Sequence, residues 1–526
     1  MKKGFIYGIL ILCVLFLLAS LLVPNYLESK LKPALEAQVI TQTDSSYAMD
    51  FKQLNISFWS KKVSADSISI LPNKENEAIK SVLIKNLEIQ GINWLSLLTD
   101  DFPNFKKVVV EYPEIEVYSR PVTSTTFGNG SSSKITSSDS LFSDFDIEIR
   151  GGKALIIDPA GRMKAMIGHF SLSATKINVN QLLDGTRLPF LDDLTVSGSD
   201  LTWQIDNKFY RLEIGSFEFD RADGLAYVKD IALIPELPRY RFTEIKGYSV
   251  DRYELNIDKI NLQGVDLDSL FVSKIKIRTA AIEQGELSVF KDKTIPPKST
   301  IAYKPLLSEV VRKASNFKYG IDEVLINNFD VTYTEHKEGA KVPGAVSFQN
   351  ITGSIQNIAT PGISGFLTDS LLFDVTTLFM GVSKLDVHSR YALFDESENH
   401  RVWGSLGAIE TSSINPTLIH LANMEAKSGK VNSLDFNFNV NREGAKGIIN
   451  LDYENLDVSL LSDFDTTNTS EGKQIATFIT NTFIVKSNNT GADFKSAEID
   501  YEWGKTRSIF GYWWHSLLSG IKNSIK

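Results

Sequence analysis

The feature that most constrains this fold is an alternation of apolar and polar residues that recurs along nearly the whole chain. Segments such as FKQLNISFW at 51–59, RLEIGSFEFD at 211–220 and KLDVHSRYALF at 384–394 place apolar side chains at about every second position. This period is that of a β-strand with one buried face. We count about two dozen such segments, which predicts a mainly β protein with antiparallel-rich pairing.

Helical patterns are too few to cover that many strands. Residues 305–317 carry apolar residues on one helical face after Pro305, and residues 25–39 and 471–482 are two further candidate helices. Because each strand has an apolar face that must leave water, the sheet has to pack on another sheet, close on itself or curl around something apolar. Two interpretations stay open: a curled sheet that encloses a groove suited to acyl chains, or a series of β-sandwiches filled by side chains.

One strand motif returns at a fixed distance along the chain. VVVEYPEIEVY at 108–118 places an apolar residue four positions before an acid, and apolar-x-apolar follows the acid. The same form begins at Val196, Ile282 and Ile326, and Val110, Val196 and Ile282 are each 86 residues apart. Such self-similarity predicts stacked repeats, with chance similarity among β-rich segments as the alternative.

A second motif precedes the first. LEIQGINWLSLL at 87–98 and INLQGVDLDSLF at 260–271 share Gln-Gly and a closing Ser-Leu, and FSLSATKINVNQLL at 170–183 is a looser copy. Its recurrence before three copies of the strand motif supports the repeat interpretation.

The alternation slips by one residue inside each strand motif, near Pro113, Ser199 and Gly285. In the first copy Val110 and Ile115 are an odd number of positions apart, so regular alternation would place them on opposite faces of the strand. A slip of one residue is typical of a β-bulge or bend, where proline and glycine are tolerated. We therefore predict kinked strands whose two halves keep their apolar residues on one face.

The N-terminus carries a candidate membrane anchor. Residues 4–23 form an uncharged run of 20 residues, which as a helix spans about 30 Å, the thickness of one hydrocarbon core. Lys2 and Lys3 precede it, so the positive-inside rule places the N-terminus in the cytoplasm and the rest of the chain on the other side. The alternative is a cleaved signal peptide.

Composition and motifs argue against nucleic-acid binding and catalysis. The net charge is −9, whereas neutralising phosphates requires a basic surface. Six histidines and one cysteine, Cys13, leave little for a catalytic or metal centre. The S-x-x-K match at 131–134 lies in a Ser/Thr/Gly-rich stretch typical of a loop, and the D-x-D pairs at 144–146, 266–268 and 463–465 are typical of solvated strands or turns. We predict a protein that is not an enzyme and has no metal or cofactor.

The C-terminal segment KTRSIFGYWWHSLLSGIKNSI is aromatic, amphipathic and flanked by basic residues. Its apolar residues recur at helical spacing, and those that we predict to contact a membrane or a partner are Phe510, Trp513, Trp514, Leu517 and Ile521. The alternative is a terminal helix that caps the open end of the sheet.

These features together resemble the AsmA-like envelope proteins. The likeness is carried by the anchor, the motif at 87–98 followed by that at 108–118, the Ser-rich break and the region at 428–461, SGKVNSLDFNFNVNREGAKGIINLDYENLDVSLL. The resemblance implies a taco-like β-sheet with a hydrophobic interior, related to bridge-like lipid transfer proteins. It also implies an inner-membrane anchor in a double-membrane envelope and movement of phospholipid toward the outer membrane. This chain is shorter than the large members of that family.

The sequence predicts an N-terminal transmembrane helix followed by an elongated, curled, repeat-built β-sheet, and the resemblance implies that its groove binds phospholipid acyl chains in the periplasm. The alternative is a scaffold or assembly factor for outer-membrane proteins, with a partner at the C-terminus. The predicted groove-lining residues are Val108, Val110, Ile115, Val117, Ile275, Ile277, Leu287 and Val289. The implied boundaries are 1–24 (tip and anchor), 25–118 (first repeat), 119–143 (linker), 144–300 (middle repeats), 301–470 (helix and β-meander) and 471–526 (terminal segment).

Overall fold

A computed structural model of the chain describes residues 45–73, 78–94, 104–119, 144–177, 193–206, 209–266, 274–298, 303–313, 318–363, 370–422, 424–461 and 485–526. Within these ranges it confirms a mainly β protein: 21 strands are joined by hydrogen bonds into one sheet, and the helices are few and short. The candidate anchor, residues 120–143 of the linker and the candidate helices at 25–39 and 471–482 lie outside the described residues.

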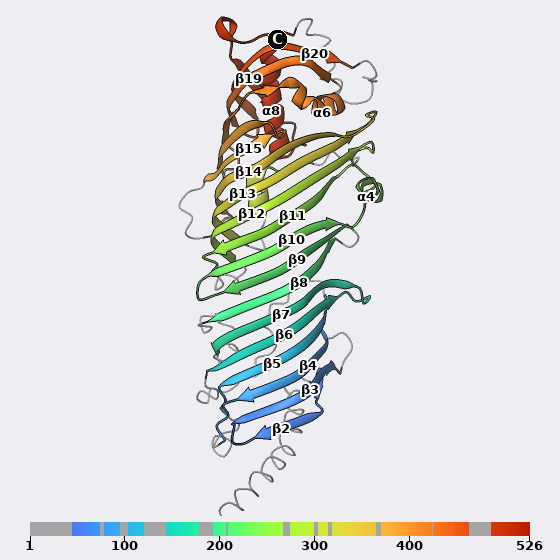
Figure 1. The fold of residues 1–526 in the computed structure, drawn as a ribbon, viewed down its shortest axis with the longest axis vertical. Coiled ribbons are helices and arrows are strands. Elements are labelled where there is room, and N and C mark those ends of the chain that lie inside the picture. The colour runs from blue at the N-terminus through green and yellow to red at the C-terminus, as the bar shows by residue number, and fades with distance from the viewer. Residues whose placement is uncertain are drawn as a thin grey trace, which may run out of the picture. The chain divides into compact units, whose positions relative to one another are not determined.

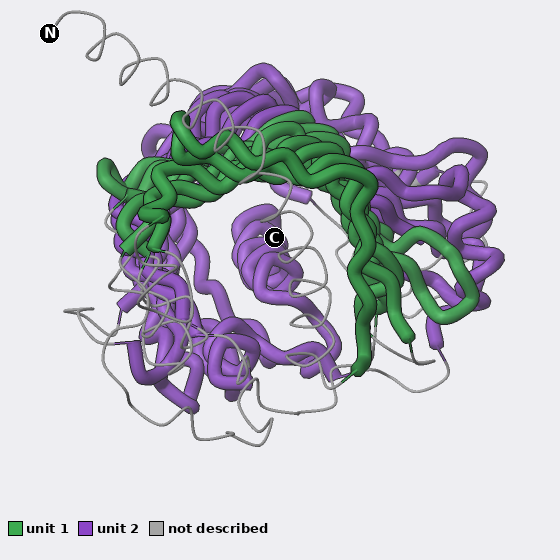
Figure 2. Tube along the Cα trace, turned by 90° about the horizontal axis from the view of Figure 1, so that it is seen from below, with its two compact units in different colours: residues 1–205, 212–226 green, residues 206–211, 227–526 purple. Residues whose placement is uncertain are grey.

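The chain divides into two compact units, and unit 1 comprises residues 1–205 and 212–226. Its strands are β1 (Tyr47–Asp50), β2 (Gln53–Ser57), β3 (Lys62–Pro72), β4 (Ile79–Gln90), β5 (Lys107–Tyr118), β6 (Phe145–Ile157), β7 (Met163–Ile177), β8 (Leu194–Asp206) and most of β9 (Tyr210–Asp220). β1 and β2 both pair with β3, and from β3 to β8 each strand pairs with the next along the chain (Figure 1). Seen end-on, these strands form an arch (Figure 2).

Among the registered pairs of unit 1, β5–β6 is parallel and the others are antiparallel. A parallel pair needs a crossover connection of a dozen residues or so, because the chain must return to the end at which the first strand began. The Ser/Thr/Gly-rich stretch is this connection, since it joins the end of β5 to the start of β6.

Left-handed residues bend the strands of unit 1. Ser67 in β3, Tyr112 in β5 and Asp200 in β8 have φ of 54°, 50° and 56°, values that residues other than glycine seldom adopt. The strand register places Ser67 and Tyr112 at the same level on the two sides of β4. It also places Gly151 of β6, which has a φ of 61°, beside Tyr112. We call these four residues the crease of unit 1. The phase slip predicted in this region is confirmed, with Tyr112 just before Pro113 and Asp200 just after Ser199.

The crease keeps the apolar residues of both strand halves on one face. In a regular strand, residues three positions apart point to opposite faces. Ala65 and Ile68 are three apart on either side of Ser67, yet both pack into one buried cluster, so the left-handed residue has reversed the alternation. The buried members of this cluster are Phe51, Leu54, Val63, Ala65, Ile68 and Ile92.

Unit 2 comprises residues 206–211 and 227–526. Its strands are β10 (Leu225–Pro235, mostly in this unit), β11 (Asp251–Gln263), β12 (Lys274–Lys293), β13 (Lys318–Lys337), β14 (Gly344–Ala359), β15 (Ser370–Phe379), β16 (Ser383–Ala392), β17 (His400–Leu406), β18 (Ile409–Glu410), β19 (Met424–Val440), β20 (Gly444–Leu460) and β21 (Ala497–Glu502). Its α-helices are α4 (Arg239–Lys246), α5 (Leu307–Lys313), α6 (Asn415–Thr417) and α8 (Ile509–Ser524), and short turns of helix lie at Thr411–Ile414, Leu418–Ala422 and Gly491–Asp493.

Unit 2 contains one strand group of the same kind as a group in unit 1. β11 pairs antiparallel with β12, which pairs parallel with β13, as β4, β5 and β6 do in unit 1. Gln284 and Asn328 lie opposite each other in β12 and β13 with φ of 49° and 55°, so the slip predicted at Gly285 is also confirmed. The Gln-Gly pairs end β4 and β11, and their glycines, Gly91 and Gly264, are both left-handed.

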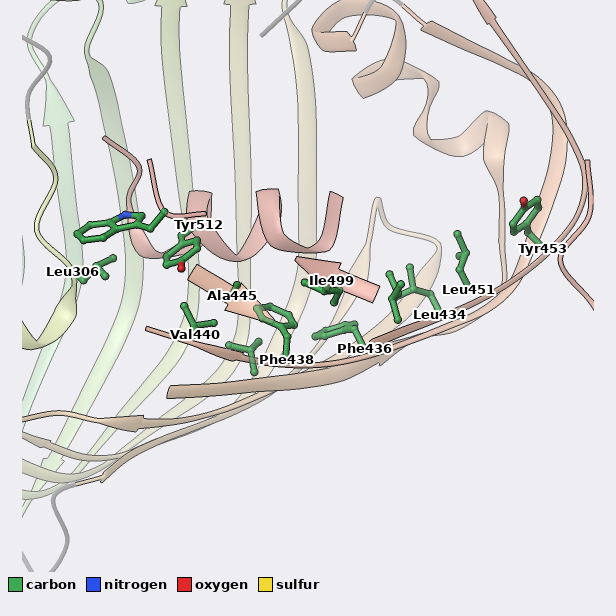
Figure 3. Close-up of a cluster of buried hydrophobic side chains, with 13 residues drawn as sticks. Leu306, Leu434, Phe436, Phe438, Val440, Ala445, Leu451, Tyr453, Ile499 and Tyr512 are labelled. Carbon is green, nitrogen blue, oxygen red and sulfur yellow. The ribbon is translucent and has the colours of Figure 1, made fainter. Parts of the chain in front are cut away.

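The largest buried cluster of unit 2 lies between the last strands and α8 (Figure 3). The strands of unit 2 curve around α8 (Figure 2), and Phe438, Ile449 and Ile499 pack beneath it with no more than 1% of their surface exposed. β19 and β20 form a hairpin whose turn is held by Asn441: its side-chain oxygen accepts hydrogen bonds from the backbone N–H groups of Glu443 and Gly444. The helix predicted at 305–317 is present as α5, which begins at Leu307, and residues 314–317 lie outside the described residues.

Candidate functional site: an apolar face of the sheet

The strand register of unit 1 carries one row of apolar side chains from strand to strand. Val110 of β5 pairs with Leu87 of β4 and with Ile149 of β6, which pairs with Leu172 of β7, which pairs with Val196 of β8. Paired residues in a sheet share a face. Since Leu87 packs against the buried cluster of β2–β4, the whole row lies on the face that carries this cluster. We call it the apolar face of unit 1.

The four lining residues predicted in β5 all lie on this apolar face. Val108 and Val110 precede the crease, and Ile115 and Val117 follow it. Tyr112 reverses the alternation between the two pairs, so their opposite parity does not place them on opposite faces. The next rows are equally apolar, because Ile156 of β6 stands beside Val117.

The apolar face of unit 2 is the face on which α8 packs. The ring of Phe373 in β15 lies 6.3 Å from the ring of Trp513 in α8. Phe373 pairs with Ile355 of β14, Ile355 with Val324 of β13, and Val324 with Ala280 of β12. Within the described residues, this row therefore runs from strands whose apolar residues pack against α5 or α8 to strands whose apolar residues are in neither of the two buried clusters with these helices.

The lining residues predicted in β12 also lie on one face. Ile358 shares a buried cluster with Ile355 because Asn357 between them is left-handed, with a φ of 61°. Ile358 pairs with Ile321, which pairs with Ile277, so Ile277 is on the apolar face, and Ile275 follows by alternation. Beyond Gln284 the alternation is reversed again, which places Leu287 and Val289 on the same face.

The opposite face of unit 1 carries ion pairs between neighbouring strands. Glu148 of β6 receives hydrogen bonds from Lys107 and Arg150, at 2.7 and 2.6 Å, and these lower the pKa of its carboxyl to about 2. Lys62 and Glu88 form a further ion pair at 2.5 Å on β3 and β4. A sheet with one charged and one apolar face can present the apolar face to a non-aqueous ligand while the other faces water.

Buried side chains fill the two apolar faces unevenly. In unit 1 the main buried cluster is confined to the region of β2–β4, and a smaller one surrounds Ala174 and Ile177. In β5, Val108, Val110, Ile115 and Val117 are only partly buried, and in β6 and β8 Ile156 and Trp203 are 37% and 52% exposed.

In unit 2, α5 and α8 cover β14 to β21, whereas Tyr253 of β11 is 42% exposed. Apolar residues on the strands between these clusters therefore remain accessible.

The five residues predicted to contact a membrane or partner separate into two groups in α8. Trp513, Leu517 and Ile521 pack against the buried cluster of unit 2, as a helix that caps the sheet would place them. Phe510 and Trp514 are 64% and 49% exposed. Contact of this second pair with a membrane or a partner stays a prediction.

A buried histidine holds α8 to the sheet. Trp513 Nε1 donates a hydrogen bond to Nε2 of His400, at 2.9 Å, and Nδ1 of His400 donates to the carbonyl oxygen of Glu398, at 2.7 Å. The imidazole stacks on Tyr391 at 4.3 Å and is 5% exposed. Because burial disfavours the charged imidazolium, the pKa of His400 falls to about 4. Protonation would also remove the lone pair that accepts from Trp513.

Acidification is therefore expected to loosen α8. The pKa of His400 is depressed in the folded protein. The contribution of this group to the free energy of unfolding is therefore complete above about pH 6.5 and is lost as the pH falls toward 4. Between pH 7.5 and 5.0 this one group costs about 2 kcal/mol of unfolding free energy. Urea unfolding followed by tryptophan fluorescence measures it as the difference between the natural chain and His400→Phe, which keeps an aromatic ring on Tyr391. Equal losses in the two proteins would contradict the prediction.

The described residues contain no group of three or more His, Cys, Asp or Glu side chains placed to hold a metal ion. They also contain no helix long and apolar enough to cross a membrane. The S-x-x-K match at 131–134 and Asp268, Asp463 and Asp465 of the D-x-D pairs lie outside the described residues.

Sequence reasoning missed charged residues that continue the apolar face of unit 2. Lys291 and Lys293 of β12 keep the alternation phase of Leu287 and Val289, so they lie at the end of the same face. The signal was present, because a strand phase that changes from apolar to basic marks the margin of an apolar surface.

The chain matches no protein-family model, and a comparison with curated proteins finds no match either.

Proposed function

We propose that this protein is a non-enzymatic lipid-binding protein whose apolar sheet faces hold or conduct the acyl chains of phospholipids. The proposal rests on a row of paired apolar residues that continues from strand to strand. The buried side-chain clusters that cover this row are confined to some of its strands. Val110, Ile149 and Val196 represent this row in unit 1, and Ala280, Val324 and Ile355 represent it in unit 2.

The energetics favour an acyl chain as the ligand. Burying a methylene group gains about 0.8 kcal/mol, so ten methylenes on such a face gain about 8 kcal/mol before the cost of ordering the chain. The described rows of this face are built from apolar residues, whereas convergent polar groups are what orients a small polar substrate. Lipids of different chain length are therefore expected to bind by the same contacts.

The candidate anchor supports a location for this activity. With residues 4–23 in the inner membrane and Lys2 and Lys3 in the cytoplasm, the sheet would lie in the periplasm. There it would accept phospholipid from the inner membrane and pass it toward the outer membrane, in support of outer-membrane biogenesis. The resemblance to AsmA-like proteins supports the same proposal.

Lipid extraction tests the proposed function. The full chain, purified in detergent and exchanged into a mild one, is expected to retain phospholipid that mass spectrometry of an organic extract identifies in stoichiometric amount. It is also expected to take up a fluorescent phospholipid from vesicles. Absence of both retention and uptake would overturn the proposal and favour the scaffold for outer-membrane proteins, which crosslinking to neighbouring envelope proteins would then reveal.

A further inference from the structure

Charged residues take over from apolar ones at one margin of the apolar face of unit 2. Asp251, Lys291 and Glu335 are paired across β11, β12 and β13, one step along the face from Val289. Lys291 Nζ lies 3.1 Å from the carboxylate of Asp251, and Lys293 Nζ lies 2.8 Å from that of Glu335. The change from apolar to ionic side chains thus occurs over two residues, about 7 Å along the strand.

Two loops of unit 2 bring further cations to this margin. The backbone N–H of Lys304, before α5, donates to the carbonyl oxygen of Lys505, at 3.0 Å, which ties that loop to the one after β21. Arg507 in the latter loop donates from Nε to the hydroxyl of Tyr501, at 2.9 Å. The side chain of Lys304 is close enough to Lys291, Lys293 and Arg507 to be affected by their charges.

Cations and carboxylates meet at this margin. The cations are Lys291, Lys293, Lys304 and Arg507, and the carboxylates beside them are Asp251 and Glu335. Partial burial, and then repulsion by neighbouring cations, lower the pKa of Lys304, although Asp251 opposes this. An ammonium group held partly out of water among like charges is stabilised when an anion binds beside it.

We propose that Lys291, Lys293, Lys304 and Arg507, the basic cluster, bind the phosphate group of a ligand whose acyl chains lie on the adjoining apolar face. The inference rests on the proposed function and names the headgroup chemistry that would accompany it. Phosphate suits the site because lysine and arginine donate charge-assisted hydrogen bonds to its oxygens. The place of Lys291 beside Val289 lets one molecule reach both surfaces.

Binding of three probes to the full chain in detergent tests the inference. The probes are dioctanoyl phosphatidic acid, dioctanoylglycerol, which has the same acyl chains but no phosphate, and inorganic phosphate. Phosphatidic acid is expected to bind at least tenfold more tightly than dioctanoylglycerol, since only its phosphate can accept charge-assisted hydrogen bonds from the basic cluster. Inorganic phosphate is expected to bind far more weakly than phosphatidic acid.

Substitutions of Lys304 assign the preference to the basic cluster. Lys304→Gln is expected to weaken phosphatidic acid binding about tenfold, to leave dioctanoylglycerol unchanged, and to be rescued by Lys304→Arg. The matched control is Lys384→Gln, which removes the same charge from an exposed lysine of β16 that pairs with Asp386. Unchanged binding of dioctanoylglycerol by each variant also shows that it has folded.

Each other outcome overturns a distinct claim. Equal affinity for the two acylated probes, with no effect of Lys304→Gln, would overturn the headgroup site and leave the acyl-binding function in place. Inorganic phosphate that binds as tightly as phosphatidic acid would show a free-anion site with no link to the apolar face. Failure of both acylated probes to bind would overturn the proposed function and this inference with it.

Discussion

Replacing Ile156 with aspartate is expected to reduce phospholipid retention by this protein at least a hundredfold. Ile156 lies on the apolar face of unit 1, beside Val117 of β5 and Ala165 of β7. A carboxylate there would meet acyl methylenes without a partner, at a cost of several kcal/mol, and a loss of about 2.7 kcal/mol already corresponds to a hundredfold. Aspartate is preferred to lysine because a long side chain could place its charge back in water.

Met166→Asp is the matched control for this experiment. Met166 of β7 pairs with Leu155 of β6 and so lies on the opposite face of the same two strands. Ile156 and Met166 are both 37% exposed, so the two changes add the same charge at positions of equal accessibility. Lipid measured by mass spectrometry is expected to remain at the natural level in Met166→Asp. Equal retention by both variants would mean that the face carrying Ile156 does not bind the lipid.

Enlarging Gly520 is expected to release α8 from the sheet. A Cβ atom at this position would stand 2.7 Å from Ile449 Cγ2 of β20 and 2.7 Å from Ile499 Cγ1 of β21, closer than carbon atoms can approach. Tyr512 and Ser516 on the same helix face are fully buried, so the helix has no room to shift outward without exposing them. Gly520→Ala is expected to cost about 1–3 kcal/mol by overpacking, and Gly520→Leu to displace the helix.

Hydrogen exchange of residues 509–524, read by mass spectrometry, measures this release. Gly511→Ala is the control in the same helix, because a Cβ there has its nearest neighbour at 3.4 Å. This control is expected to stabilise α8 slightly, since alanine favours a helix over glycine by up to about 1 kcal/mol. Protection of α8 that persists in Gly520→Leu would show that the close contact with Ile449 and Ile499 does not hold the helix.

The local rules of strand structure made much of this fold predictable. Alternation indicates which side chain faces which way, and a slip of one residue near Pro113 or Gly285 indicates a reversal. The left-handed residues Tyr112 and Gln284 stand one position before these two sites. The turn between β19 and β20 is equally local, because Asn441 and Gly444 form it.

Contacts between distant segments could not be predicted in this way. Trp513 and His400 are far apart in sequence, and nothing in the pattern around either residue specifies their hydrogen bond. The same holds for Lys304, whose neighbours in space come from β12 and from the loop after β21. The parallel pairing of β5 with β6 depends on a crossover that leaves no periodic signal.

The group of two antiparallel strands followed by a parallel one has a consequence for how such a chain evolves. The group ends with a strand that can pair with the first strand of another group, so duplicating the encoding segment in frame adds strands without altering the side chains that line either face. Each added strand lengthens the sheet by about 4.8 Å. The number of strands in a sheet of this design is therefore set by copy number, and a longer sheet would require no new chemistry.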